Sequence, residues 1–171
     1  MNARPAHQVA AAIIRREDEI ALVLQGGPGD EPFWGLPGGV VEPDELVPEG
    51  LVREVLEETG LAIHFPARLG YIRQIDNRRP ARLTRHRGTG EGYVVTVWLF
   101  DVDSWDGEIG AHDPDGVVDE ARFVPVEEAI ERLRQTHWLE LAADYLEGAV
   151  GSGSLRFERW HEEGTIERVS S

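Results

Sequence analysis

The stretch from Trp34 to Leu61 (WGLPGGVVEPDELVPEGLVREVLEETGL) constrains this 171-residue chain more than any other. It reads as a glycine-rich turn, an acidic loop and one short helix. Proline costs little in the first turn of a helix, so Pro48 marks the start of this one. Glycine suits the left-handed position that follows the last turn, so Gly60 marks its end. The stretch therefore predicts a helix held between two loops.

Three glutamates of this predicted helix share one flank, because Glu57 and Glu58 follow Glu54 by three and four positions. The opposite flank carries the aliphatic residues that a core would cover: Leu51, Val52, Val55 and Leu56. Like charges at these spacings repel by roughly 0.2–0.5 kcal/mol per pair in an isolated helix. A divalent cation among the oxygens would relieve this, since Mg²⁺ takes carboxylate, carbonyl and water oxygens together with substrate phosphates. The alternative is an ordinary solvated acidic face, which is what most charge runs are.

The wider pattern favours the first alternative. Gly39, Glu45 and the run from Arg53 to Leu61 (REVLEETGL) match the Nudix box at its defining positions. The preceding WGLPGG (34–39) is similar to the usual lead-in of that family. The segment Gly39 to Leu61 therefore resembles the Nudix hydrolase family.

The resemblance implies a metal site, with Mg²⁺ as the cofactor and Mn²⁺ as the alternative. It implies that the ligands are one backbone carbonyl and three carboxylates: Gly39, Glu54, Glu57 and Glu58. Glu54 is also a candidate for orienting or deprotonating the attacking water. Arg53 is expected among the catalytic residues, where it pairs with Glu45 and holds the loop to the helix rather than contacting substrate.

A later acidic residue often completes the site in this family. The segment 117–124 (VVDEARFV) predicts a strand that carries Asp119 and Glu120. Glu120 is the first candidate for this role and Asp115 the second, although each is equally well a carboxylate in water. Trp34 or Tyr71 could stack on a base, but aromatic residues are more often core.

Composition narrows the function classes. There is no cysteine, which excludes a disulfide framework, a zinc–thiolate site and thiol chemistry and agrees with a cytoplasmic protein. No apolar run approaches the 18 or so residues of a membrane helix, and Arg15 ends the N-terminal apolar run too early for a signal peptide. The formal net charge of −15 disfavours nucleic-acid binding, because phosphate backbones would be repelled.

The basic residues are unevenly distributed. All 17 are arginines, and the window 68–87 holds seven of them: Arg68, Arg73, Arg78, Arg79, Arg82, Arg85 and Arg87. This segment is either a basic flap that engages substrate phosphates or a set of arginines that balance acidic neighbours. The sequence leaves both open.

The remaining patterns predict the other elements. Strands are expected at 8–15, 20–24, within 63–75, at 92–102 and at 117–124, and helices at 126–135 and 136–146. A stripe in the last helix predicts core packing: Trp138, Leu141, Ala142 and Tyr145. With the resemblance, this order implies an α/β fold, a Nudix-type α/β/α sandwich with a mixed β-sheet over residues 1–148. Residues 149–171 predict a linker and a C-terminal β-hairpin extension, which either covers the sheet or pairs with a second subunit in a homodimer.

The function implied is divalent-metal-dependent hydrolysis of a diphosphate bond in a nucleoside diphosphate derivative or nucleoside triphosphate by metal-activated water. The partner would be a small nucleotide or other diphosphate, with no nucleic acid or membrane. The alternative is a non-catalytic Nudix module that binds a nucleotide or sugar for regulation, which an incomplete box would favour. Isomerisation of an isoprenoid diphosphate on the same fold is a further alternative. It normally needs a reactive cysteine, and this chain has none, which disfavours it. Nucleoside triphosphates, dinucleoside polyphosphates, ADP-ribose and coenzyme-linked diphosphates all stay open, because loops outside the box select among them.

Overall fold

A computed structural model describes residues 4–26, 31–65, 67–79, 92–112, 114 and 116–169. The strands of this part are β1 (Ala6–Arg16), β2 (Glu19–Gln25), β3 (Phe33–Gly35), β4 (Gly38–Val40), β5 (Ala62–Ile63), β6 (Arg68–Asn77), β7 (Tyr93–Val102), β8 (Trp105–Asp106), β9 (Val118–Pro125), β10 (Ser154–Trp160) and β11 (Ile166–Arg168). The helices are α1 (Val47–Thr59), α2 (Val126–Arg134) and α3 (Glu140–Leu146), with a 3₁₀ turn, η2 (His137–Leu139), before α3. These elements confirm the predicted order.

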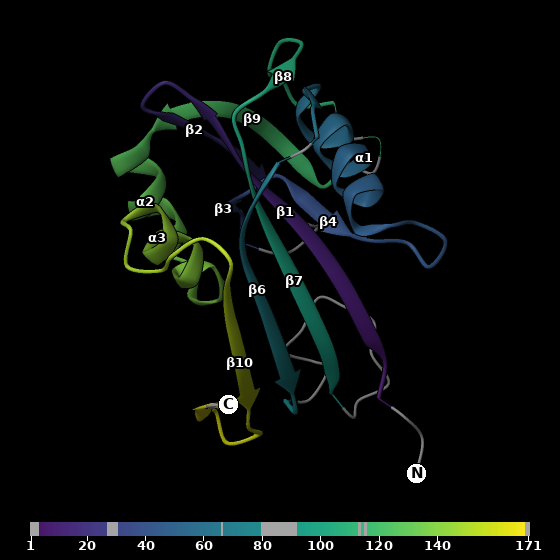
Figure 1. Cartoon of the computed structure of the whole chain (residues 1–171), viewed down its shortest axis with the longest axis vertical. Helices are drawn as coiled ribbons and strands as arrows, with labels where there is room; N and C mark the ends of the chain where they lie inside the picture. The colour runs from purple at the N-terminus through teal and green to yellow at the C-terminus, as the bar shows by residue number, and fades with distance from the viewer. Residues whose placement is uncertain are drawn as a thin grey trace.

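A mixed sheet forms the centre of the molecule, with its main path in the order β11-β10-β6-β7-β1-β2-β3 (Figure 1). The pairs β1–β7 and β6–β10 are parallel, whereas β6–β7, β1–β2 and β2–β9 are antiparallel. Strand β7 lies in the middle of this path, as its apolar sequence indicates. The short strand β4 pairs with β1 off the main path, and this pairing brings the glycine-rich turn to the centre of the sheet.

Helices lie on both sides of the sheet, as the α/β/α prediction requires. Successive residues of a strand face opposite sides, so the neighbours Ile13 and Ile14 enter different cores. Ile13 packs in the core that includes residues of α2 and α3, such as Leu133. Ile14 packs in the core that includes Leu51 and Val55 of α1. The sheet is therefore covered by α1 on one face and by α2 and α3 on the other (Figure 1).

Two helical stripes differ from the prediction. In α1, Leu56 is 47% exposed and Glu58 is buried, because the buried stripe that passes through Val55 continues three residues later at Glu58. The predicted stripe near α3 is correct for Tyr145, which is buried, but wrong for Trp138, which is 47% exposed. Trp138 lies in η2, before α3 begins, so the spacing of that helix does not apply to it.

The C-terminal residues form the predicted hairpin. Strands β10 and β11 are antiparallel, and β10 also pairs with β6 along its whole length. The hairpin is tied to the sheet by a buried ion pair, in which Arg73 of β6 donates to Glu158 of β10 at 2.7 Å. It therefore extends the edge of the sheet of the same chain rather than covering a face. The division at residue 148 and the homodimer stay predictions.

No helix within the described ranges is long and apolar enough to cross a membrane.

Candidate active site

The backbone of β4 is pressed between β1 and α1. Gly38 has a φ of +139°, and a Cβ there would lie 2.1 Å from the carbonyl oxygen of Ala10. A Cβ at Gly39 would lie 2.5 Å from the carboxylate of Glu54. Glycine is needed at both positions because the backbone approaches its neighbours more closely than a side chain allows. The turn thus places the Gly39 backbone directly against Glu54.

Local interactions fix the ends of α1. At the start, the N–H of Leu46 donates to the Glu49 carboxylate at 2.7 Å, and the N–H of Glu49 donates to the Leu46 carbonyl at 2.9 Å. Pro48 lies in the first turn, as predicted. At the other end, Gly60 has the expected left-handed conformation, with a φ of 73°. These contacts set the position at which the glutamates of the helix emerge.

The predicted ion pair between Arg53 and Glu45 is present. Arg53 donates to both carboxylate oxygens of Glu45, from Nε at 2.6 Å and from Nη2 at 2.9 Å, and Nη2 also donates to the Val40 carbonyl at 3.1 Å. The hydrogen bond from Arg53 lowers the pKa of Glu45 to about 2. Arg53 thereby joins the acidic loop, strand β4 and helix α1.

The remaining nitrogen of Arg53 faces the catalytic candidates. Nη1 donates to Glu54 Oε1 at 2.8 Å and to Glu57 Oε2 at 3.2 Å. Burial raises the pKa of Glu54, and this effect outweighs the hydrogen bond and the charge of Arg53, which lower it. The single guanidinium nitrogen therefore compensates the buried Glu54 carboxylate only in part.

Glu58 has a different environment. Its carboxylate accepts a hydrogen bond from the N–H of Gly38 at 2.8 Å, so it links the glycine-rich turn to the helix. Within the described residues, no three acidic or histidine side chains are grouped closely enough to bind one metal ion. The three glutamates share the helix, but they do not converge on one point in this arrangement.

The donor set nevertheless fits a hard divalent cation. Glu54, Glu57 and the Gly39 carbonyl offer oxygens only, which Mg²⁺ and Mn²⁺ prefer. The Glu54 carboxylate already lies against the Gly39 backbone, and its partner Arg53 keeps two other acceptors in Glu45 and Val40. Within the part of the chain that the structure describes, a cation at Glu54 and Glu57 would compete only with the hydrogen bonds from Arg53 Nη1.

The residues proposed outside α1 have separate surroundings. Glu120 in β9 pairs with Arg122 of the same strand at 3.3 Å, and Asp115 lies outside the described residues. The guanidinium groups of Arg122 and Arg132 lie over the Trp34 ring, 4.8 and 4.5 Å from its centre. A base that stacked on Trp34 would have to compete with these arginines.

The stacking prediction is wrong for Tyr71, which is buried and packs edge-on against Tyr145. Tyr71 faces the core under α2 and α3. An aromatic ring in the middle of a strand that helices cover packs in the core more readily than it is exposed to a ligand.

The arginine-rich segment divides into parts. Arg68 pairs with Asp101 at 3.0 Å and Arg73 with Glu158 at 2.7 Å, so both balance acidic neighbours. Arg79 lies over the Trp160 ring, 4.9 Å from its centre. Arg78 contacts Asp76. The other members, Arg82, Arg85 and Arg87, lie outside the described residues.

Asp101 is a buried acidic residue that the sequence analysis missed. It lies near the end of β7 and accepts hydrogen bonds from Arg15 at 2.7 Å, from Arg68 at 3.0 Å and from the Tyr145 hydroxyl at 3.1 Å. A single acid in the apolar run YVVTVWLFDV was the available signal, since a charge in a buried strand needs partners.

The fold and the helix that carries the three glutamates define a class of α/β proteins, and comparison with known protein families identifies this class. The family model described as the NUDIX domain matches residues 5–143, and the chain belongs to this family. The CTP pyrophosphohydrolase of Escherichia coli is 30% identical over 112 residues, which are 65% of this chain and 73% of that protein. The ADP-ribose pyrophosphatase of Methanocaldococcus jannaschii is 34% identical over 101 residues, 59% of this chain and 53% of that protein.

The structural comparison agrees on the fold. The crystal structure of a mutator MutT protein from Bacillus halodurans has a TM-score of 0.67 with 19% identity, and the match covers 96% of this chain and 95% of that chain. The aligned segments span as little as 41% of a curated relative, and the relatives named above differ in substrate. The family and fold predictions are confirmed.

Proposed function

We propose that this protein hydrolyses a diphosphate bond in a nucleoside diphosphate derivative or nucleoside triphosphate with the help of a divalent cation. The observation that carries this proposal is the Glu54 carboxylate, half-buried on a helix beside Glu57 and pressed against the Gly39 backbone. An oxygen-rich site of this kind suits a metal and its diphosphate ligand. The pyrophosphohydrolase names of two relatives support the same reaction type.

The residues of the site have distinct proposed roles. Gly39, Glu54 and Glu57 would hold the cation, and Glu58 would join them after giving up its contact with the Gly38 N–H or would keep the turn in place. Glu54 would also orient the attacking water. Arg53 is a positioning residue, because its contacts with Glu45 and Val40 hold the loop and β4 against the helix. Glu120 stays a candidate for a further acidic contribution from β9.

A bound Mg²⁺ or Mn²⁺ would supply charge neutralisation for the phosphate oxygens and a lower pKa for water. The protein contributes the position of the oxygens and the orientation of the water. Arg53 limits repulsion among the carboxylates through Nη1 until the cation binds. The expected partners are small diphosphates rather than nucleic acid, and the cytoplasmic location stays a prediction.

The test is a panel of nucleoside triphosphates, dinucleoside polyphosphates, ADP-ribose and coenzyme-linked diphosphates, assayed for products with Mg²⁺, with Mn²⁺ and with chelator. We expect turnover of at least one class with metal, and a loss of about a hundredfold or more in Glu54→Gln. Glu49→Gln is the matched control, since Glu49 lies on the same helix at its N-terminal cap. Hydrolysis at the parental rate by Glu54→Gln would overturn the role of Glu54.

The second candidate is a Nudix module that binds a nucleotide or sugar without cleaving it. The hydrogen bonds from Arg53 Nη1 to Glu54 and Glu57 are the observation that favours it, because an arginine that held both carboxylates permanently would exclude the cation. Tight binding of a panel member without any product under all metal conditions would select this alternative.

A further inference from the structure

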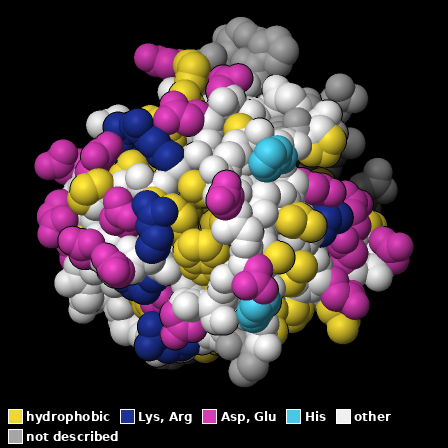
Figure 2. Space-filling model, turned by 90° about the horizontal axis from the view of Figure 1, so that it is seen from above, with side chains coloured by type: hydrophobic (Ala, Val, Ile, Leu, Met, Phe, Trp, Pro, Cys, Tyr) yellow, Lys and Arg dark blue, Asp and Glu magenta, His cyan; other side chains and the backbone are white. Residues whose placement is uncertain are grey.

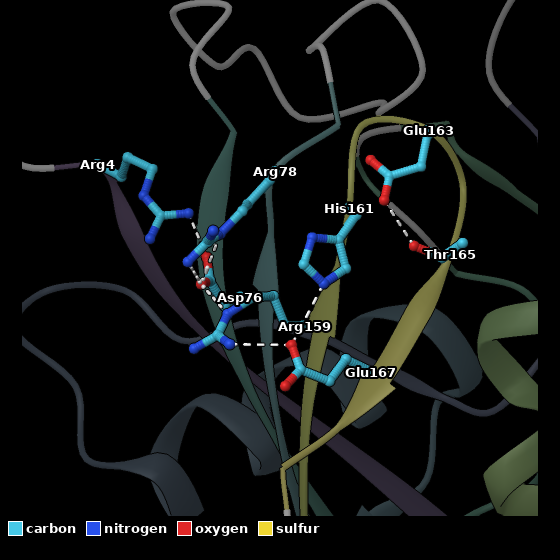
Figure 3. A network of polar contacts seen from close by, with 8 residues as sticks. All are labelled: Arg4, Asp76, Arg78, Arg159, His161, Glu163, Thr165 and Glu167. Carbon is cyan, nitrogen blue, oxygen red and sulfur yellow. Dashed lines mark hydrogen bonds and ion pairs between the residues drawn. The ribbon is translucent and has the colours of Figure 1, made fainter.

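Three arginines from distant parts of the chain meet at one carboxylate at the end of β6 (Figure 3). This end of β6 and helix α1 lie toward opposite ends of the molecule (Figure 1). Arg4, Arg78 and Arg159 each contact Asp76, with Arg78 at 3.1 Å and Arg159 at 3.3 Å. Arg159 also donates to Glu167 at 3.0 Å. We name Arg4, Arg78 and Arg159 the distal arginine cluster.

The distal arginine cluster carries more positive charge than its partners neutralise. Three guanidinium groups meet two carboxylates, Asp76 and Glu167, so the group has a net charge of 3 − 2 = +1. Each guanidinium has five N–H donors, far more than two carboxylates can accept. The three side chains are 31%, 44% and 34% exposed, so these donors are open to an anion from solvent.

This local excess is unusual for a chain with a formal net charge of −15. Figure 2 shows acidic side chains at both sides of the opposite end of the molecule, with arginines among them. An anion approaching the protein therefore finds a favourable potential only at particular places. The distal arginine cluster is one such place among the described residues.

The cluster lies on the face of the sheet that α1 occupies further along. In β7, Val102 packs in the core beneath α1, and residues two apart share a face, so Trp98 and Thr96 point to the same side. Gln74 of β6 donates to Thr96 at 3.1 Å, which places Gln74 on this face too. Asp76, two residues after Gln74, therefore presents the cluster on the α1 side of the sheet.

Polar and aromatic groups line the face between the two sites. Trp98 Nε1 donates to Gln8 at 3.1 Å, and Gln74 donates to Thr96. Helix α1 packs on β1, β4, β5 and β9, and the lower halves of β6 and β7 extend away from it (Figure 1). On this part of the face Gln74 is exposed and Thr96 and Trp98 are partly exposed, so a ligand that lay along the strands would contact them.

The register gives the length of such a ligand. Gly39 pairs with Ala10, and Ala10 is level with Trp98 and Ile72. Asp76 is therefore four residues along β6, about 13 Å, and three strand spacings across, about 14 Å. The resulting separation from Gly39 is about 20 Å, and the length of the arginine side chains shortens the span that a ligand must cover.

We propose that the distal arginine cluster binds the part of a substrate's polyphosphate chain that is most distant from the diphosphate bond cleaved beside Gly39 and Glu54. This inference rests on the proposed function and narrows it to small-molecule diphosphates with additional phosphates, such as dinucleoside polyphosphates of increasing phosphate number. Arg159 lies outside the segment 5–143 that the family model matches, so this subsite is a feature that the C-terminal hairpin gives to this chain.

The first experiment compares kinetics across a dinucleoside polyphosphate series, with ADP-ribose as the short reference substrate. In the parental protein, kcat/KM should rise with phosphate number. In Arg159→Gln the ratio of kcat/KM between the longest substrate and ADP-ribose should fall about tenfold, mainly through KM, since a charged hydrogen bond is lost. Arg134→Gln is the matched control, because Arg134 at the end of α2 is a similarly exposed arginine that also pairs with two acids, Asp144 and Glu147.

The second experiment measures binding of inorganic tripolyphosphate by calorimetry with metal removed by a chelator, so that the acidic face of α1 cannot bind it. Binding should weaken about tenfold in Arg159→Gln and tighten in Asp76→Asn, which removes the competing carboxylate. A cluster that only fastens the hairpin would bind tripolyphosphate no more tightly in Asp76→Asn, and that variant would have a lower melting temperature. The melting temperature is therefore recorded for each variant.

The outcomes separate the two proposals. If no diphosphate is hydrolysed by the parental protein, the proposed function fails, whatever the calorimetry shows. If diphosphates are hydrolysed but Arg159→Gln and Arg134→Gln have the same substrate ratios and the same tripolyphosphate affinity, the subsite is wrong and the proposed function stands.

Discussion

Two acidic residues, Asp101 and Glu54, both lie beside arginine, and their surroundings differ in how completely the charge is compensated. Asp101 has a side chain that is 2% exposed and accepts from Arg15, Arg68 and the Tyr145 hydroxyl. Burial alone would raise its pKa, but these partners outweigh burial and the pKa is lowered. Glu54 is less buried and, among the described residues, accepts a hydrogen bond only from Arg53 Nη1, and its pKa is raised.

The difference separates a structural ion pair from a site that can still take a cation. At Asp101 the donors from β1, β6 and α3 use the carboxylate fully, so the group stabilises the junction of these elements. At Glu54 the main hydrogen bonds of the arginine go to Glu45 instead. A carboxylate that is buried without full compensation has more to gain from a divalent ion.

Replacement of Asp101 should have the largest effect on stability. Asp101→Asn removes the buried charge that accepts from Arg15, Arg68 and Tyr145, and the free energy of unfolding should fall by about 1.5–3 kcal/mol. Urea unfolding followed by circular dichroism measures this, with Asp106→Asn as control because that carboxylate is 80% exposed. Equal losses in the two variants would show that the Asp101 network is not structural.

Gly39→Ala should have the next largest effect, on activity rather than stability. Its Cβ would lie 2.5 Å from the Glu54 carboxylate, which can move because it is the end of a flexible side chain. A displacement of about 1 Å at a reacting centre costs about a hundredfold in rate, so kcat/KM should fall by about that factor while the melting temperature is kept. Gly38→Ala should instead lower the melting temperature, since its Cβ would meet backbone. If Gly39→Ala has the same kcat/KM as the parental protein, the proposed contrast between the Glu54 site and the Asp101 ion pair is wrong.

A smaller effect should appear in the pH dependence of stability. The carboxyl pKa values of Asp101 and Glu158 are lowered because their arginine partners outweigh burial. Their stabilisation is therefore complete above the unfolded pKa, about 4, and is lost as pH falls through the folded pKa values. Each unit of lowering corresponds to about 1.4 kcal/mol. Urea midpoints between neutral and acid pH should fall less steeply in Asp101→Asn than in the parental protein, and equal slopes would contradict the assignment.

The sequence predicts those parts of the molecule that local spacing determines. The identity and order of neighbouring residues predict the two termini of α1, marked by Pro48 and Gly60. They also predict the strand at 92–102 and the pair between Arg53 and Glu45. The Nudix box identifies the family because its residues must lie together on one loop and one helix.

Other features depend on contacts between segments that are distant in the chain. Glu58 lies on the buried stripe because β4 passes directly beside α1, and the spacing within the helix does not reveal this. Asp101 and Trp34 acquire their arginine partners from other strands or from α2. Asp76 acquires Arg4 from the N-terminal segment and Arg159 from the hairpin. The hairpin itself was recognisable, but its place beside β6 depends on the buried pair between Arg73 and Glu158.

The most direct test of the metal site is a calorimetric titration of Mg²⁺ and Mn²⁺ into the parental protein and Glu54→Gln, with and without a non-hydrolysable diphosphate. We expect saturable binding to the parental protein that weakens by at least about tenfold in Glu54→Gln, while the free energy of unfolding without metal is unchanged or higher. Equal metal affinity in the two proteins, or no binding to the parental protein even with the diphosphate, would contradict the claim that the glutamate face of α1 is a divalent-cation site.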